Sequence, residues 1–260
     1  MPSVTINHRG IISNKGPLAI AALLAILLTG VRPVSAQKTH TIYAEDFAGQ
    51  ASRHLDGVAP HVDHGPSATW TAGSQNVPGN GKGAGGGWWA NGHTKVGNAL
   101  GEAYLSFTPH PGHIYTLSAN IKIQSDPVAP YYSLQMGFIG NPGTRSDLDQ
   151  SSGYAFVTIS QHPYALLWTN PKLVFSQPPD KPGTNTVSIV LNTAGPQWTC
   201  NFILNGKSYG PATFKANPSI KAVGLGNTGG NVSGTFSKFS LTESGNHLRA
   251  RAAKLVKSAK

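Results

Sequence analysis

Hydrophobic and polar residues alternate with a period of two along most of the segment from Asn185 to Tyr209. The apolar positions are Val187, Ile189 and Leu191 in its first half and Trp198, Cys200, Phe202 and Leu204 in its second. This period is typical of half-buried antiparallel β-strands, and no helical period fits it. Gly195-Pro196 marks a turn between the two strands, and Asn205-Gly206 is a hairpin signal after the second.

Similar short apolar runs, separated by Gly, Pro, Asn and Ser, continue from Thr39 to Thr242. They predict strands at 41–47, 103–108, 114–124, 131–139, 154–160, 164–168, 186–191, 198–204, 222–225 and 234–241. About ten strands without a helical stripe indicate an all-β fold, a two-sheet antiparallel β-sandwich or jelly roll. Cys200 falls in the inward register of its strand, so we expect a buried thiol rather than a reactive one.

Residues 1–36 have the layout of a secretory signal peptide. Arg9 and Lys15 precede an apolar run at 17–28, and Val34-Ser35-Ala36 offers small residues for cleavage. The run is shorter than the roughly 20 residues that cross a bilayer, so cleavage is favoured over an uncleaved anchor. We expect an exported protein that is extracellular, periplasmic or associated with the cell envelope, with a sandwich domain at 37–243 and a basic tail at 244–260.

The formal net charge of +10 is unevenly distributed along the chain. The leader and the last twelve residues hold eight of the 20 Lys and Arg residues and none of the ten acidic residues. The domain between them is nearly neutral, which argues against nucleic acid as a partner. The tail either contacts a membrane or an acidic polymer, or is simply solvated. The oligomeric state is left open.

Short motifs follow one another in a characteristic order along the domain. They lie at 45–47, 55–60, 68–70, 103–105, 115–117, 136–138, 189–193 with Trp198, 202–206 and 233–241. Together they resemble the concanavalin A-like lectin/glucanase superfamily, specifically the LamG-like jelly-roll domains of secreted bacterial proteins. The resemblance implies a sandwich closed by pairing between the last strand and the first. It implies little about activity, because one fold hosts many functions.

Glycan-cleaving enzymes need two carboxylates that face the scissile bond. Apart from Glu45, the domain contains only Glu102 and Glu243, and neither has an acid two or four residues away. Glu45 and Asp46 are adjacent, so on a strand they point to opposite faces. We therefore favour a non-catalytic protein.

A sugar lyase is a second enzymatic interpretation, in which a His or Tyr abstracts a proton beside a uronate carboxylate. His162, Tyr164 and Arg145 could be assembled into such a site, although their spacing does not require it.

Two groups of residues contain metal-binding side chains. His61, Asp63 and His64 could bind zinc, but the surrounding Pro and Gly favour an exposed loop, and we expect no stoichiometric zinc. Asp147 and Asp149 could bind calcium, although their loop lacks the spacing of an EF-hand. We expect no cofactor, with calcium the one open alternative.

Carbohydrate binding needs an aromatic platform with hydrogen-bonding groups beside it. The candidate residues are Trp88, Trp89, Asn91, His93, Tyr131 and Gln135. Consecutive tryptophans on a strand face opposite ways, so at most one of the first two is an exposed platform. The other tryptophans, Trp70, Trp168 and Trp198, are expected in the core.

These observations favour an exported, non-catalytic β-sandwich that binds carbohydrate or another cell-surface ligand. A polysaccharide-degrading glycosidase or lyase of the same fold is one alternative. A structural or adhesive module of the cell envelope is another. Membrane contact is expected only through the leader or the basic tail.

We predict that truncating the chain after Gly245 leaves the melting temperature of the domain nearly unchanged, because a solvated tail adds no buried surface. Thermal unfolding of the full and truncated proteins measures this. A large drop in Tm would show that the tail docks on the domain.

Overall fold

The computed structural model describes residues 38–47, 53–66, 69–72, 88–90, 93–96, 101–124, 133–142, 153–160, 165–169, 172–177, 183–228 and 233–245. We call these the described residues. Every pair of neighbouring strands within them is antiparallel. None of them is helical, so the described part of the chain offers no helix that could cross a membrane.

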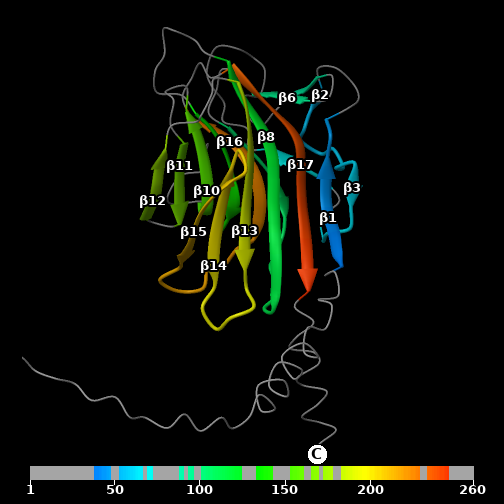
Figure 1. Cartoon of the computed structure of the whole chain (residues 1–260). Coiled ribbons are helices and arrows are strands. Elements are labelled where there is room, and N and C mark those ends of the chain that lie inside the picture. Colours follow the sequence, from blue (N-terminus) through cyan, green and yellow to red (C-terminus); the bar gives the residue numbers. More distant parts are fainter. Residues whose placement is uncertain are drawn as a thin grey trace, which may run out of the picture. The chain divides into compact units, whose positions relative to one another are not determined.

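The strands form two sheets (Figure 1). The ten-stranded sheet has the order β15 (Lys207–Thr213), β14 (Thr199–Leu204), β13 (Thr184–Asn192), β8 (His113–Gln124), β17 (Ser233–Gly245), β6 (His93–Val96), β5 (Trp88–Ala90) and β2 (Arg53–His54), with β1 (Thr39–Glu45) beside β17 and β3 (Val62–Asp63) beside β1. The seven-stranded sheet has the order β12 (Lys172–Gln177), β11 (Ala165–Thr169), β10 (Gly153–Ser160), β9 (Ser133–Ile139), β16 (Ala222–Thr228), β7 (Gly101–Ser106) and β4 (Thr71–Ala72).

This architecture confirms the all-β sandwich predicted from the alternating pattern, and each predicted strand is present with shifted ends. The additional strands are β2 to β6, β12 and β15. β17 extends to Gly245, which still pairs with His113, so Ser244 belongs to the sandwich rather than to the tail. The predicted leader at 1–36 and residues 246–260 of the predicted tail lie outside the described residues.

The Asn205-Gly206 hairpin joins β14 to β15 as predicted. Both residues have positive φ, 51° and 83°, and Leu204 pairs with Lys207 across the turn. Positive φ at both central residues defines the type I′ turn, whose twist matches that of the flanking strands. The Asn205 side chain also accepts a hydrogen bond from the backbone amide of Thr186 at 2.9 Å, which ties the turn to β13.

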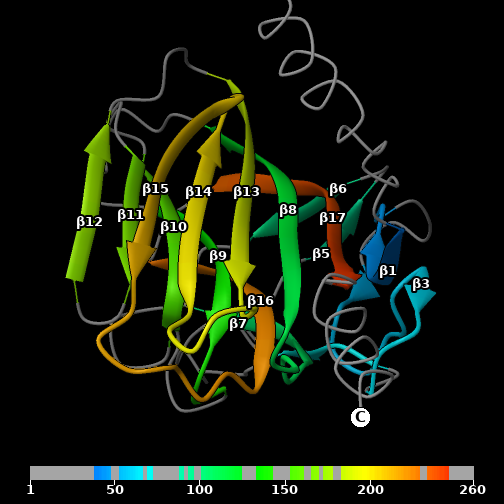
Figure 2. The ribbon, with the colours of Figure 1, turned by 60° about the horizontal axis from the view of Figure 1, so that its bottom comes forward.

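β17 connects more strands than any of its neighbours in the ten-stranded sheet. One edge pairs with β8 from Ser233 to Gly245, and the other edge pairs first with β6 and then with β1. The change of partner coincides with an irregularity between Ser237 and Ser240, where Lys238 has a φ of 53°. Figure 2 shows the resulting bend in β17.

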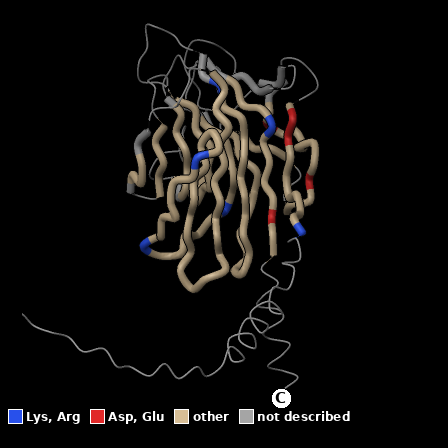
Figure 3. Tube along the Cα trace, viewed as in Figure 1, with Lys and Arg blue, Asp and Glu red and all other residues tan. Residues whose placement is uncertain are grey.

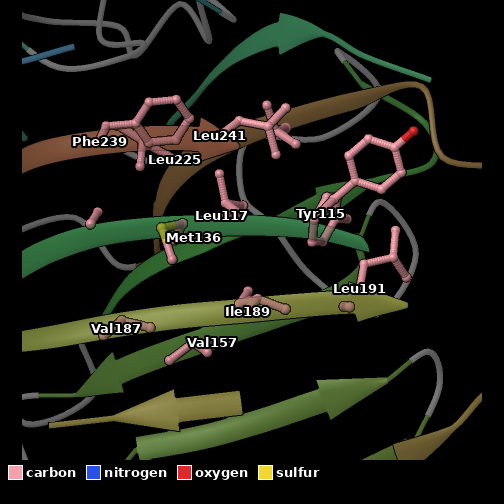
Figure 4. Close-up of a cluster of buried hydrophobic side chains, with 14 of the residues drawn as sticks. Tyr115, Leu117, Met136, Val157, Val187, Ile189, Leu191, Leu225, Phe239 and Leu241 are labelled. Carbon is pink, nitrogen blue, oxygen red and sulfur yellow. The ribbon is translucent and has the colours of Figure 1, made fainter. Parts of the chain in front are cut away.

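The core lies between the two sheets and confirms the period-two pattern. Figure 4 shows labelled apolar side chains of both sheets meeting in this interior, among them Leu117, Ile189, Met136 and Val157. Cys200 is fully buried as predicted, and burial raises the pKa of its thiol. Each such aliphatic or aromatic side chain stabilises the fold by about 1.5–3 kcal/mol relative to exposure.

One carboxylate is buried with this core. Glu45 at the end of β1 is 1% exposed, whereas the neighbouring Asp46 is exposed, so the two point to opposite sides as predicted. Glu45 Oε1 accepts a hydrogen bond from the amide of Phe47 at 2.8 Å. Its Oε2 is buried as well. Burial raises the pKa of this carboxyl, and the Phe47 amide offsets part of that effect.

We predict a pH-dependent stability difference between the wild type and Glu45→Gln. Because the pKa of Glu45 is raised in the folded state, its contribution to stability is complete below the ordinary carboxyl pKa and is lost as pH rises through the folded-state pKa. The wild type should therefore lose Tm relative to the variant, which cannot ionise, as pH rises from about 4 to about 8. A Tm difference that stays constant over this range would contradict the assignment.

Candidate functional site

The outer face of the seven-stranded sheet carries a row of aromatic residues and glycines. Cross-strand pairs align Tyr104 with Gly224, Gly224 with Gly137, Gly137 with Phe156, and Phe156 with Trp168. The next residue along each of these strands is buried in the core, so the row faces the other way. We call these five residues the aromatic row.

The glycines let the aromatic rings lie against the sheet. A Cβ atom on Gly137 would lie 2.4 Å from the Cβ of Phe156 and 2.6 Å from the carbonyl oxygen of Ala155. The ring of Phe156 is stacked on that of Trp168, with centroids 5.9 Å apart and planes 9° from parallel. Phe156 is buried, whereas Trp168 and Tyr104 are half-buried. The exposed parts of the row therefore lie at its two ends.

A second row on the same face contains two uncharged polar residues, Gln135 and Thr158. Gly226 pairs with Gln135, Gln135 with Thr158, and Thr158 with Leu166. The Gln135 amide nitrogen donates a hydrogen bond to the Thr158 hydroxyl at 3.4 Å. Both side chains are buried, at 4% and 6% exposed. An amide and a hydroxyl thus lie beside the aromatic row, in surroundings where a hydrogen bond is stronger than in water.

Charge is sparse on the described strands (Figure 3). Within the described strands of the seven-stranded sheet, one acidic residue takes a position on the outer face. This residue is Glu102 of β7, which pairs with Gly226. The half-buried rings of Tyr104 and Trp168 suit a ligand with apolar ring surfaces.

The predicted binding residues fall on different sheets. Trp88 and Trp89 form β5 and His93 begins β6, so these three share one hairpin of the ten-stranded sheet. Gln135 is on β9 of the seven-stranded sheet, beside the aromatic row. Asn91 and Tyr131 lie outside the described residues.

The prediction that Trp168 belongs to the core is wrong. In β11 the buried positions are Ala165, Leu167 and Thr169, so Leu166 and Trp168 point to the outer face. The predictions for the other two tryptophans are confirmed, with Trp70 1% and Trp198 9% exposed.

The three zinc candidates lie within the described residues, and each has different neighbours. Asp63 Oδ1 accepts a hydrogen bond from the amide of Gly65 at 3.1 Å. His64 stacks on His40 with ring centroids 5.2 Å apart, and His61 is exposed. Across the described residues, no three His, Cys, Asp or Glu side chains come together as metal ligands. The calcium candidates Asp147 and Asp149 lie outside the described residues, as do His162, Tyr164 and Arg145.

A pocket that the sequence did not reveal lies where β1, β8 and β17 meet. Its volume is about 300 Å³, and it is lined by Lys38, His40, His113, Glu243 and Gly245. We call it the histidine pocket. The strand register explains it, because His40 lies opposite Glu243, and His113 lies opposite Gly245.

The carboxylate of this pocket is held by two neighbours. His113 Nδ1 lies 2.7 Å from Glu243 Oε1, and the Tyr115 hydroxyl donates a hydrogen bond to the same oxygen at 3.1 Å. The backbone amide of His110 in turn donates to the Tyr115 oxygen at 2.8 Å. Burial raises the pKa of the Tyr115 hydroxyl well above its ordinary value, so this group remains a donor.

Comparisons with known proteins find solved structures of similar fold. No family model matches the chain, and no curated protein matches it either. Among solved structures, the endo-1,3-β-glucanase of Streptomyces sioyaensis superposes with a TM-score of 0.52 and 15% identity, covering 82% of this chain and 99% of the glucanase. The carbohydrate recognition domain of Emp47p has a TM-score of 0.48 and 10% identity, covering 81% and 98%. The CBM2 module of the evolved Dit of Lactobacillus casei BL23 phage J-1 has a TM-score of 0.49 and 11% identity, covering 82% and 98%.

At such identities the likeness shows the fold and not the activity. The described strands form a two-sheet antiparallel β-sandwich whose fold is similar to that of the glucanase.

We predict that Gly137→Ala destabilises the protein by about 1–3 kcal/mol, because the added methyl group has no space beneath Phe156. Urea unfolding measures the change. The control is Gly195→Ala, whose Cβ would lie no closer than 3.2 Å to a neighbouring atom. Equal free energies of unfolding for the two variants would show that the row is not closely packed on its glycines.

Proposed function

We propose that this chain is an exported, non-catalytic β-sandwich that binds a glycan on the outer face of its seven-stranded sheet. The observation that carries the proposal is the aromatic row, with Tyr104 at one end and the Phe156–Trp168 stack at the other. A pyranose ring has an apolar C–H face that packs on aromatic side chains and hydroxyl groups that hydrogen-bond at its edge. The leader-like sequence at 1–36 supports export.

The residues beside the Phe156–Trp168 stack are uncharged. The Gln135 amide donates a hydrogen bond to the Thr158 hydroxyl at 3.4 Å, and both side chains are buried. A neutral ligand that packs on this stack therefore meets no desolvated ion from these two residues.

The carboxylates support binding rather than hydrolysis. Glycosidases place two carboxyl groups within about 5–10 Å of each other across the scissile bond. Glu45 is buried with the core, and Glu243 is held by His113 and Tyr115 in the other sheet. Among the described strands this leaves Glu102 as the one acidic position on the outer face.

We expect a glycan array to give a signal for the wild type that Trp168→Ala lowers by about tenfold or more in affinity, equivalent to about 1.4 kcal/mol. A β-1,3-glucan is the first probe, because the similar glucanase is named for that polymer. Trp168→Phe keeps an aromatic ring and should lose less. Lys215→Ala, exposed and outside the aromatic row, should bind as the wild type does.

Two results would contradict the proposal. Equal binding by the wild type and Trp168→Ala, with loss in Trp89→Ala instead, would move the site to the β5–β6 hairpin. Release of reducing ends or unsaturated products from the bound polysaccharide would make the protein an enzyme.

A further inference from the structure

We propose that the histidine pocket is a second ligand site, which binds the carboxylate of an acidic saccharide such as a uronic acid residue. The pocket is formed by strands of the ten-stranded sheet, whereas the aromatic row belongs to the seven-stranded sheet. The inference therefore uses different residues from the proposed function. It rests on that function only for the class of ligand, a saccharide.

Two neighbouring side chains reduce the repulsion between Glu243 and an anion in the pocket. Its Oε1 faces His113 Nδ1 at 2.7 Å and receives the Tyr115 hydroxyl at 3.1 Å. An ion pair of this geometry offsets the charge of the carboxylate whenever the imidazole carries a proton, and the Tyr115 hydroxyl donates to the same oxygen. Among the residues that line the pocket, Glu243 is the one acid, and its Oε1 already faces His113 and accepts the Tyr115 hydroxyl.

The exposed donors of the pocket are basic. Lys38 and His40 are exposed and line it from β1 and the residue before it, and the ring of His113 lines it from β8. Because Nδ1 of His113 faces Glu243, its other ring nitrogen, Nε2, is the one that can reach a ligand. Lysine and imidazolium groups bind carboxylates through charge-assisted hydrogen bonds.

Further titratable side chains lie around the pocket. His64 stacks behind His40 at 5.2 Å between ring centroids, and the ring of His110 lies 6.3 Å from that of His113. Asp63 of β3 is an acid that directly precedes His64 in the sequence. Its Oδ1 accepts a hydrogen bond from the amide of Gly65. The pocket and its rim therefore combine four histidines and one lysine with few acids.

The size of the pocket favours a sugar over a small inorganic anion. A volume of about 300 Å³ lies at the lower end of the range for small-molecule sites. It can accommodate a pyranose ring together with its carboxylate. A free phosphate or sulfate would leave most of this space filled with water.

Calorimetry of the purified protein with trigalacturonate tests the proposal. Histidine side chains gain positive charge as pH falls from about 8 to about 5, whereas a uronate carboxylate stays ionised, so binding should tighten from about pH 7.5 to about pH 5.5. Lys38→Ala and His40→Ala should each weaken it by about tenfold, the usual size of a charge-assisted hydrogen bond. Both residues are exposed, so the variants should keep the Tm of the wild type.

Matched controls separate this site from general charge effects and from the aromatic row. Lys215→Ala and His61→Ala remove the same side-chain types from exposed positions that do not line the pocket, and should leave the affinity for trigalacturonate unchanged. Trp168→Ala should also leave it unchanged while weakening the neutral glycan. A variant that loses only the neutral glycan therefore tests the aromatic row, and a variant that loses only trigalacturonate tests the histidine pocket.

The following results would overturn the inference. Trigalacturonate could fail to bind at either pH, or bind no better than neutral galactotriose. Lys38→Ala could bind it as tightly as Lys215→Ala does. Inorganic phosphate could bind as tightly as the trisaccharide, which would make the pocket a small-anion site.

Discussion

The pairing of β17 with β8 is the interaction on which the rest of the structure depends. Residues Ser233 to Gly245 of β17 pair with β8, with one irregularity between Ser237 and Ser240, and the opposite edge of β17 pairs with β6 and β1. Strands from both ends of the described chain are thus joined through a single ladder. Because β8 also pairs with β13, this ladder links the two halves of the ten-stranded sheet against which the core packs.

Both candidate sites follow from this arrangement of two sheets. The histidine pocket exists because the register of β17 with β1 and β8 brings His40, Glu243 and His113 to the ends of three adjacent strands. The aromatic row exists because the seven-stranded sheet contributes one face to the core and places glycines opposite aromatic residues on the other. The first site offers basic groups and the second neutral ones, so the two suit different parts of a glycan, or different glycans.

The sequence predicted the long strands because burial repeats at every second residue, as in β13 and β14. It did not predict β2 to β6, which are two to four residues long and carry too little of that period. The orientation of Trp168 was not predictable, because Leu166 and Leu167 beside it are both apolar and give β11 no polar side. The histidine pocket was missed for a different reason: Tyr115 and Glu243 are 128 residues apart, and only the strand register brings them together.

The central claim is that the outer face of the seven-stranded sheet binds a glycan. Its most direct test is an NMR titration of the isotope-labelled protein with the tightest-binding neutral oligosaccharide. The account predicts that the amide shifts concentrate on β7, β9, β10, β11 and β16, around Tyr104, Gly137 and Trp168. Shifts confined to β13, β14 and β15, or none at saturating oligosaccharide, would contradict it.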